Sequence, residues 1–328
     1  MRSFLIEAML LILVVGTFGV STATPAGYDL AGTNLFGRLW LMFQDGLIPS
    51  DNSFLHQWGV TKIQAPQAWQ IAQGDSGVVV AILDSGIDMD HPDLQGKIVA
   101  YANFTTSDTP DDQLGHGSHV AGIAAASSNN DLGIAGVGYN CSLMNVKVLD
   151  DDGKGYSSWV AKGLRWAVDN GADIINMSVV IDTSSRQLES AVNYAWEHGV
   201  IVVAAAGNDG DSESVYPAYY SHCIAVAATD SHDSLAGFSN RGDWVDVAAP
   251  GVRIYSTLDD GGYGYKSGTS QATPHVAGLA ALLYEVVEDA NDNGKINDEV
   301  RDIIESTCDP MNGVEWGRIN ALEALSAA

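Results

Sequence analysis

The stretch that decides the fold is Gly77-Val78-Val79-Val80-Ala81-Ile82-Leu83, which is followed at once by Asp84-Ser85-Gly86. A short apolar run rich in β-branched residues, with a glycine before it and a polar turn after it, is typical of a fully buried strand. Such strands occur in parallel sheets whose two faces are covered by helices. We therefore expect a parallel α/β sheet, with Asp84 at the carboxyl end of one of its strands.

Similar apolar runs recur along the chain and alternate with stretches of helical periodicity. This alternation predicts one α/β domain over residues 50–328, with helices on both faces of a mainly parallel sheet. The functional edge of such a sheet lies at the carboxyl ends of its strands. Further strands are expected at Ser142–Leu149, Ala172–Val180, Val200–Ala206 and Cys223–Ala228, and helices at His119–Ser127, Ser158–Asn170, Arg186–His198 and Thr273–Val287.

The composition argues against several classes of function. The 328 residues include 41 Asp and Glu but only 15 Lys and Arg, so the net charge is −26, while 46% of the residues are hydrophobic. That hydrophobic share is enough for a folded core and argues against intrinsic disorder. Because no stripe of Lys and Arg exists, nucleic acid and anionic membranes are not expected as partners. Three widely spaced cysteines fit neither a zinc site nor a disulfide scaffold, and their pairing stays open.

The amino-terminal part of the chain is expected to direct export. Arg2 precedes an apolar run from Ala8 to Val20, and Ser21-Thr22-Ala23 offers a small-residue cleavage site, so residues 1–23 are interpreted as a secretory signal peptide. The run is short for a membrane span, which needs about 20 apolar residues, although an uncleaved membrane anchor is the alternative. Residues 24–49 then form a short pro-segment or linker. We expect a secreted, extracellular monomer without a stable membrane partner.

Three glycine-rich segments each place one reactive side chain at the end of a strand or the start of a helix. Asp84 follows the first strand, His116 opens a helix, and Ser270 begins a long apolar helix whose first turn is expected to contain Pro274. An acid, a histidine and a serine can form a nucleophilic triad, because the histidine takes the serine proton and the acid fixes the imidazole tautomer. Asn208 ends another buried strand, where its amide can complete an oxyanion hole beside the helix start.

These segments resemble those of the subtilisin family of serine proteases (subtilases, peptidase S8), most closely its thermitase-like branch. The order Asp, His, Asn, Ser along the chain matches, and the likeness runs from Ser50 to Leu325. It includes less distinctive stretches such as Lys62–Trp69 and Tyr216–Tyr220. The resemblance implies a three-layer subtilisin-like α/β fold and a serine endopeptidase that hydrolyses peptide bonds through an acyl-enzyme.

The resemblance also implies roles for individual residues. Asp84, His116 and Ser270 match the catalytic triad, and Asn208 matches the oxyanion donor. Extended peptides or unfolded proteins are the expected substrates. The matching walls of the substrate groove are Ser178, Val179 and Val180 on one side and Ala205, Ala206 and Gly207 on the other.

Two positions depart from the family pattern. The residue after the nucleophile is usually Met, whose oxidation would put a polar sulfoxide beside the serine, but here it is Gln271. We therefore expect unusual tolerance of peroxide. The family's Ser-Leu-Gly strand reads Ser178-Val179-Val180, which can still pair with an extended peptide as an added strand. Because Val180 replaces glycine, a preference for large apolar substrate side chains does not follow.

Other interpretations fit the residues less well. A catalytically silent subtilase-fold binding protein would usually lack a triad member, and none is missing here. An α/β-hydrolase esterase predicts the order Ser, Asp, His and a Gly-x-Ser-x-Gly elbow, and the sequence has neither. His119 and His275 are expected to pack in the core. The glycines at 133, 136 and 138 have the wrong spacing for a dinucleotide fingerprint, so no organic cofactor is expected.

The resemblance further implies structural calcium, a hard cation that takes about six to eight oxygen ligands. The family's strong site combines an amino-terminal residue, an Asp after the first catalytic motif and the loop after the histidine helix. A plain Asx-rich turn is the alternative interpretation of that loop. The matching ligands are the side chains of Asp51, Asp93 and Asn130 and the carbonyls of Ser128, Leu132 and Ile134.

Two further loops carry partial calcium signals. In the thermitase-like branch the loop before the catalytic histidine binds another ion, and the matching acids here are Asp108 and Asp111. The alternative is a solvated acidic loop. Residues 289–300 match a helix-loop calcium pattern at several positions, but the twelfth residue is Val300 rather than an acid. A surface loop between two helices explains that segment better.

Overall fold

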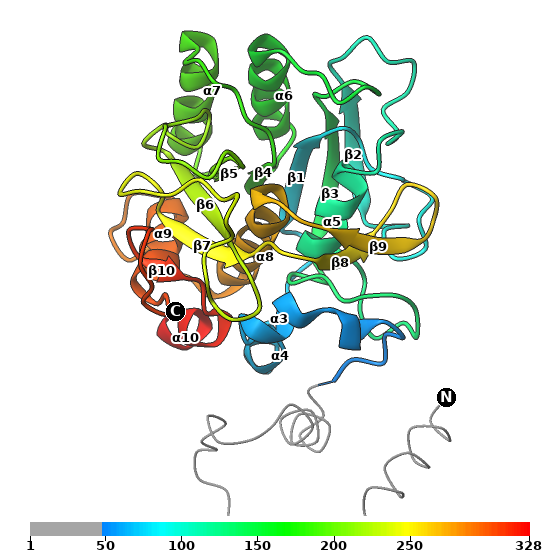
Figure 1. Ribbon diagram of the computed structural model, residues 1–328, viewed down its shortest axis with the longest axis vertical. Coiled ribbons are helices and arrows are strands. Elements are labelled where there is room, and N and C mark those ends of the chain that lie inside the picture. The colour runs from blue at the N-terminus through cyan, green and yellow to red at the C-terminus, as the bar shows by residue number, and fades with distance from the viewer. Residues whose placement is uncertain (1–47) are drawn as a thin grey trace, which may run out of the picture. The chain divides into compact units, whose positions relative to one another are not determined.

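The computed structural model describes residues 48–328 (Figure 1). The expected signal peptide at 1–23 and nearly all of the expected pro-segment or linker at 24–49 lie outside the described residues. Within residues 48–328, no helix is both long enough and apolar enough to cross a membrane.

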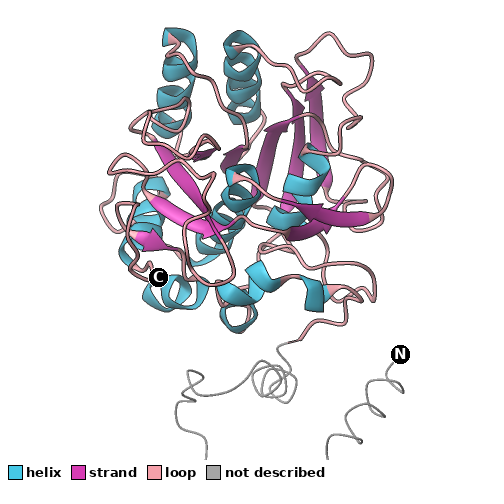
Figure 2. Ribbon diagram, viewed as in Figure 1, coloured by secondary structure: helices cyan, strands magenta, loops and turns pink. Residues whose placement is uncertain are grey.

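One parallel sheet dominates the described part of the chain (Figure 2). Its strand order is β10-β7-β6-β5-β4-β1-β3-β2, and every neighbouring pair runs parallel. The expected parallel α/β sheet is therefore confirmed. The strands are β1 (Val79–Asp84), β2 (Ile98–Asn103), β3 (Ser142–Lys147), β4 (Ile174–Met177), β5 (Ile201–Ala205), β6 (Cys223–Thr229), β7 (Val247–Pro250) and β10 (Gly317–Arg318).

The central strand β1 supplies side chains to both faces of the sheet. Val80 and Ile82 belong to one hydrophobic core, whereas Ala81 and Leu83 belong to a second core on the opposite face. Successive residues of a strand point to opposite faces, so a continuous apolar run is needed where both faces are covered. This requirement explains why the run from Gly77 to Leu83 identified the strand.

Helices cover the two faces of the sheet in pairs. Helices α6 (Ser157–Asp169) and α7 (Arg186–Glu197) lie side by side and contribute apolar residues to the core that contains Ala81. Helices α5 (Gly117–Ala125) and α8 (Thr269–Val286) pack on each other and contribute to the other core (Figure 1). The three-layer subtilisin-like architecture expected from the sequence is thus confirmed.

The remaining elements are short and lie outside the main sheet. An antiparallel pair of strands, β8 (Ile254–Thr257) and β9 (Tyr263–Lys266), leads into the start of α8. Near the amino-terminal and carboxyl-terminal ends of the described part are η2 (Phe54–His56), α3 (Trp58–Lys62), α4 (Ala65–Ala68), α9 (Asn297–Ser306) and α10 (Ala321–Ala327).

The structure differs from expectation at the start of α8. The sequence pattern predicted a helix from Thr273 with Pro274 in its first turn, but α8 begins at Thr269 and Pro274 lies inside it. Proline has no N–H to give to the carbonyl four residues earlier, which is that of Ser270. That carbonyl instead accepts the hydroxyl of Ser178 at 2.9 Å. A contact from the residue that follows β4 therefore makes an interior proline tolerable.

The three cysteines are all free. Cys141 and Cys223 are buried and Cys308 is partly buried. Burial raises the pKa of the Cys141 and Cys308 thiols to about 12 in each case, so both stay protonated at neutral pH.

Candidate active site

The carboxyl end of β1 and the start of α5 bring an acid and a histidine together. Asp84 is the last residue of β1 and is completely buried. Its Oδ1 lies 2.7 Å from Nδ1 of His116, which caps the amino terminus of α5. The same oxygen accepts the N–H of Ser85 at 2.7 Å. The contact between Asp84 Oδ1 and His116 Nδ1 assigns a proton to Nδ1. The other ring nitrogen, Nε2, is therefore free to accept a proton.

The pKa of His116 is raised above its ordinary value of 6.5. Burial disfavours the charged ring, but the negative charge of Asp84 and its hydrogen bond to the imidazole outweigh that effect. The positive charge of Lys266 opposes the rise. The arrangement therefore stabilises an imidazolium, which is what a general base becomes after it takes a proton.

Ser270 is the second residue of α8 and is joined to the end of β4 by two hydrogen bonds. The Ser178 hydroxyl donates to the Ser270 carbonyl at 2.9 Å, and the Ser270 hydroxyl donates to the Ser178 carbonyl at 3.3 Å. Asn176 donates to the Ser178 hydroxyl at 3.1 Å and so helps to hold it. In this structure the Ser270 hydroxyl is directed to Ser178 rather than to His116. Hydrogen bonds between catalytic groups are often loose before substrate binds.

Asn208 follows β5 and is oriented by the first residue of α8. Its Oδ1 accepts the backbone N–H of Thr269 at 2.8 Å and the Thr269 hydroxyl at 3.1 Å. Because the oxygen is occupied, the Nδ2 group is the free end of the amide, and a Cβ placed on Gly268 would lie 3.5 Å from it. The N–H groups in the first turn of a helix have no acceptor inside the helix. Asn208 and the start of α8 can thus donate together to one negative oxygen.

The residues expected to form the substrate groove lie at the ends of β4 and β5. Ser178 and Val179 are buried, whereas Val180 is 39% exposed. The expected strand Ala172–Val180 is shorter in the structure, since β4 ends at Met177. Among residues 48–328, no backbone group is hydrogen-bonded to the main chain of Val180. That main chain can therefore pair with an added strand.

The residues expected to form the opposite wall of the groove are all buried. Ala205 and Ala206 have no exposed surface. Gly207 is buried, has φ +101° and donates its N–H to the Thr269 hydroxyl at 3.2 Å. A Cβ at Gly207 would lie 2.6 Å from Nδ2 of Asn240, so only glycine fits.

The two other histidines singled out in the sequence pack in the core. His119 is completely buried, and its Nε2 lies 3.1 Å from the Ile254 carbonyl. His275 is buried too, and its Nδ1 lies 2.9 Å from the Gln271 carbonyl. Burial lowers the pKa of His119 to about 3 and that of His275 to about 4. Both rings are therefore neutral at physiological pH and play the packing role that the sequence predicted.

Two of the expected calcium ligands lie close together under the loop that follows α5. Asp51 and Asp93 are both buried, and burial together with the charge of Asp93 raises the pKa of Asp51. Asp93 accepts the N–H of Ile134 at 3.0 Å and the Tyr263 hydroxyl at 2.9 Å. Two buried carboxylates that repel each other form a donor set that a hard cation would stabilise.

The remaining ligands of that site fit the cation in part. Asn130 donates its amide nitrogen to Asp93 at 2.9 Å and accepts the Leu132 N–H with its oxygen at 2.9 Å. The amide would have to rotate to present oxygen to a cation. Ser128 donates its hydroxyl to Asp51 at 2.8 Å. Within residues 48–328, no three His, Cys, Asp or Glu side chains gather at one point, so calcium here would depend on Asn and carbonyl oxygens.

The other two loops with calcium signals differ from each other. In the loop before His116, Asp111 accepts the N–H of Met89 at 3.2 Å, whereas Asp108 is exposed. In the loop after α8, Asp289 accepts the N–H of Gly294 at 2.7 Å. The twelfth position of that pattern, Val300, is completely buried in the core, so no ligand can come from it.

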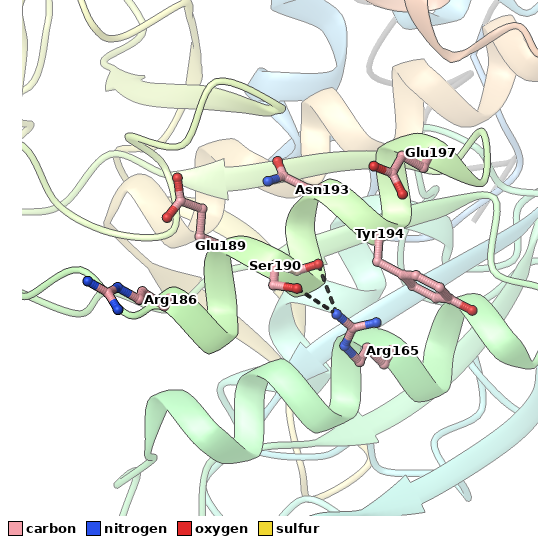
Figure 3. Close-up of a pocket in the computed structure, with 7 residues that line it drawn as sticks. All are labelled: Arg165, Arg186, Glu189, Ser190, Asn193, Tyr194 and Glu197. Carbon is pink, nitrogen blue, oxygen red and sulfur yellow. Dashed lines mark hydrogen bonds between the residues drawn. The ribbon is translucent and has the colours of Figure 1, made fainter.

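A hollow is lined by residues of α6 and α7 (Figure 3). These two helices contribute to the core on the opposite face of the sheet from α5 and α8. Within it, Arg165 donates to the carbonyl and hydroxyl of Ser190 at 3.0 and 2.9 Å. The same guanidinium lies 4.6 Å from the centre of the Tyr194 ring. These side chains stabilise the contact between two helices, and the hollow does not belong to the site at the strand ends.

Sequence reasoning missed two residues that organise the site. Thr269 orients Asn208, and Asp112 binds the backbone on both sides of His116. Both lie within or next to the glycine-rich segments, but only their contacts distinguish them from ordinary loop residues. The sequence shows an acid four positions before the histidine, but only the structure shows that this acid is buried.

The chain is similar to known proteins over most of its length. The family model described as "Subtilase family" matches residues 75–319. "Thermitase" of Thermoactinomyces vulgaris is 48% identical over 283 residues, which cover 84% of this chain and 99% of that protein. "Thermophilic serine proteinase" of Bacillus sp. (strain AK1) is 45% identical over 291 residues, covering 87% of this chain and 71% of that protein. "Subtilisin E" of Bacillus subtilis (strain 168) is 46% identical over 256 residues, covering 76% and 65%.

The family match spans the sheet, the helices around it and the segments that carry Asp84, His116, Asn208 and Ser270. Relatives that cover most of the chain at 45% and 48% identity include a thermitase. The chain therefore belongs to the subtilase family, in its thermitase-like branch, and is a subtilisin-like serine endopeptidase, a hydrolase that acts on peptides or proteins.

Proposed function

We propose that Asp84, His116 and Ser270 are the catalytic triad of this endopeptidase and that Asn208 is its oxyanion donor. The observation that supports the proposal most directly is the 2.7 Å contact between Asp84 Oδ1 and His116 Nδ1. It leaves His116 Nε2 free to act as a base towards Ser270, which lies in the first turn of α8. No other function of the site is favoured by an observation.

In the proposed reaction, the Ser270 hydroxyl turns from the Ser178 carbonyl towards His116 and attacks the substrate carbonyl. His116 takes the serine proton, and Asp84 stabilises the imidazolium that forms. The oxygen of the tetrahedral intermediate accepts hydrogen bonds from Asn208 Nδ2 and the start of α8. His116 then protonates the leaving amine, which gives an acyl-enzyme. Water, deprotonated by the same histidine, hydrolyses that ester.

Substrate is proposed to bind as an extended strand beside Ser178–Val180. The exposed side chain of Val180 and its main chain, which no backbone group among residues 48–328 binds, support pairing through the backbone. Because pairing with the main chain at Ser178–Val180 needs an extended peptide, recognition would depend mainly on an unfolded substrate conformation. Side-chain preference would be set at Val180, which stands where the family has glycine.

The serine assignment is tested by comparing Ser270→Ala with Ser267→Ala on a denatured protein substrate. Ser267 is an exposed serine three residues earlier, whose hydroxyl accepts the N–H of Arg253 at 2.8 Å, so it is a matched control. We expect Ser270→Ala to lose on the order of 10⁶-fold in kcat, as in subtilisin, and Ser267→Ala to stay active. Proteolysis retained in purified Ser270→Ala would refute the assignment.

We also propose that calcium binds between Asp51 and Asp93, with Asn130 and the carbonyls of Ser128, Leu132 and Ile134 as further ligands. The closeness of two buried carboxylates supports this site. The ion would supply charge compensation and would tie the loop after α5 to the start of the domain. Asp108 and Asp111 are proposed ligands of a second ion.

We also propose that the protein is exported from the cell. Residues 1–23 would be removed as a signal peptide, and residues 24–49 would form a pro-segment or linker before the catalytic domain at 50–328. The protein would then act outside the cell as a monomer. Amino-terminal sequencing of the secreted product tests this: a mature chain that begins at Met1 would contradict it.

A further inference from the structure

A buried carboxylate in the loop before α5 collects five hydrogen bonds. Asp112 is 2% exposed. Its Oδ1 accepts the N–H groups of Leu114 and Gly115, each at 3.0 Å, and the Ser85 hydroxyl at 2.8 Å. Its Oδ2 accepts the N–H of Ser118 at 2.9 Å and the Ser118 hydroxyl at 2.7 Å. Every partner donates, so both oxygens of the carboxylate act as acceptors.

The two hydroxyls extend this network to the loop after β1. The Ser85 hydroxyl accepts the N–H of Gly117 at 3.0 Å, and the Ser118 hydroxyl accepts the N–H of Asp88 at 2.8 Å. Ser85 directly follows Asp84 in the chain. The carboxylate of Asp112 therefore links the end of β1 to the first turn of α5.

His116 lies at the centre of the segment that this network holds. The N–H groups of the residues on either side, at positions 114, 115, 117 and 118, are bound by Asp112 directly or through Ser85. Gly115 has φ +70°, which lets the chain turn around the carboxylate. A Cβ on Gly117 would run into the Gly86 carbonyl, so α5 is packed directly against the loop after β1.

We propose that Asp112 is a positioning residue for the triad: it fixes the backbone around His116 so that the imidazole stays between Asp84 and Ser270. The inference rests on the proposed catalytic function. A misplacement of about 1 Å can cost on the order of 100-fold in rate, so a carboxylate that never touches substrate can still set kcat.

The charge of Asp112 also acts on His116. Asp84, from β1, raises the pKa of His116 most strongly among the charged groups, Lys266 from β9 lowers it, and Asp112 raises it. His119 is near enough on α5 for the two histidines to interact, and it is neutral at working pH. The carboxylate of Asp259 also lies near, since a Cβ on Gly115 would touch it. Removing the charge of Asp112 should therefore move the acid limb of kcat/KM to lower pH.

The test is Asp112→Asn, which keeps the size of the side chain but replaces one acceptor oxygen by a donor. Asp173→Asn is the matched control, because Asp173 also accepts a backbone N–H, that of Val79 at 2.9 Å, but at the amino end of β1. We expect Asp112→Asn to lose about 10- to 100-fold in kcat, with KM changed by less than about twofold. The acid limb of kcat/KM for Asp112→Asn should move to lower pH. Asp173→Asn should keep kcat and the acid limb, whatever its effect on melting temperature.

Ser118→Ala keeps the test decisive if Asp112→Asn does not fold. It removes one hydroxyl from the network and leaves the carboxylate in place, so a loss of kcat at unchanged KM and melting temperature is expected. Asp112→Asn with kcat within about twofold of wild type, or with an unmoved acid limb, would overturn the inference. So would an unfolded Asp112→Asn together with wild-type kcat in Ser118→Ala. Failure of the catalytic proposal would give a different result: wild type and Ser270→Ala would then have the same kcat in the same assay.

Discussion

The pKa of His116 depends on the residues that surround its ring. The buried carboxylate of Asp84 favours the charged imidazole, while burial and Lys266 disfavour it, and the balance raises the pKa above 6.5. A general base must be neutral to accept a proton, so activity is expected to rise with pH as His116 loses its proton. We therefore expect His116 to control the acid side of the pH profile.

Replacing Lys266 by Met should move that profile in a known direction. Without the positive charge the imidazolium becomes more favourable, so the pKa of His116 rises further and the acid limb of kcat/KM shifts to higher pH. Lys162→Met, on the exposed side of α6, is the control and should leave the limb unchanged. The measurement is kcat/KM against pH at low ionic strength. A shift of the Lys266→Met limb to lower pH would contradict this account of the site.

Gln271 next to the proposed nucleophile predicts resistance to oxidation. The side chain is 2% exposed and has no sulfur to oxidise. We expect wild type to keep its activity in dilute peroxide, whereas Gln271→Met, which restores the family's usual residue, should lose activity over time. Residual kcat/KM after timed exposure is the measurement. Equal inactivation of the two proteins would show that oxidation elsewhere decides the outcome.

At the scale of elements, the site depends on close packing between α5 and α8. Gly278 of α8 faces the chain that leaves α5: a Cβ there would lie 2.6 Å from Cβ of Val137 and 2.8 Å from the Ala124 carbonyl. Both neighbours are completely buried, so neither can move away without disturbing the core. The distance between the helices that carry His116 and Ser270 is therefore set by a glycine.

Gly278→Ala should push these helices apart. Overpacking of this kind costs about 1–3 kcal/mol of unfolding free energy, and a drop in kcat should accompany it because His116 and Ser270 lie on the displaced helices. Gly237→Ala is the control, since a Cβ there meets nothing within 4 Å. Denaturant unfolding in a Ser270→Ala background, which prevents self-digestion, measures the stability difference. Equal stability of the two variants would mean that the helices adapt without cost.

The elements show what local sequence can and cannot predict. The strands buried on both faces, such as β1 and β5, were predictable because their apolar runs are continuous. β2 lies at the edge of the sheet and alternates in burial, so its run gave no comparable signal. The start of α8 was misplaced because Pro274 is tolerated through a contact with Ser178, and no local pattern reports a partner that is 92 residues away.

In the site, too, local sequence predicts some residues, whereas the roles of others depend on contacts that only the structure shows. Asp84, His116, Asn208 and Ser270 could be proposed from the sequence because each stands where a glycine-rich segment ends a strand or starts a helix. Thr269 and Asp112 were missed because their roles consist of hydrogen bonds to backbone groups, which composition and spacing do not reveal. For Val180, the sequence signalled an altered groove, and the structure adds that its side chain is 39% exposed.

At the scale of the whole molecule, the net charge of −26 is the dominant property. Acidic groups repel one another, which destabilises the compact state unless salt or bound cations compensate. The repulsion is strongest where two carboxylates are buried close together, as Asp51 and Asp93 are. We interpret the acidity as suited to a saline or calcium-bearing exterior, and it has little direct part in the chemistry of the triad.

Removal of calcium should therefore destabilise the fold. At about 100-fold excess over Kd, one bound ion stabilises by about 2.7 kcal/mol, which for a protein of this size is a change in Tm on the order of 5–10 °C. We expect a chelator to lower Tm by that amount in the Ser270→Ala background, and added calcium to restore it. Asp93→Asn should lose this response, whereas Asp131→Asn, an exposed acid of the same loop, should keep it. A calcium response that survives in Asp93→Asn would place the ion elsewhere.

The most direct test of the central claim is covalent labelling with a fluorophosphonate, followed by mass spectrometry of the digested protein. The reagent reacts only with a serine activated by a neighbouring base. We predict one adduct per molecule, located on Ser270, that is absent from Ser270→Ala and formed at the wild-type rate in Ser267→Ala. A wild-type protein that stays unlabelled, or that carries the adduct on another residue, would contradict the assignment of Ser270 as the nucleophile.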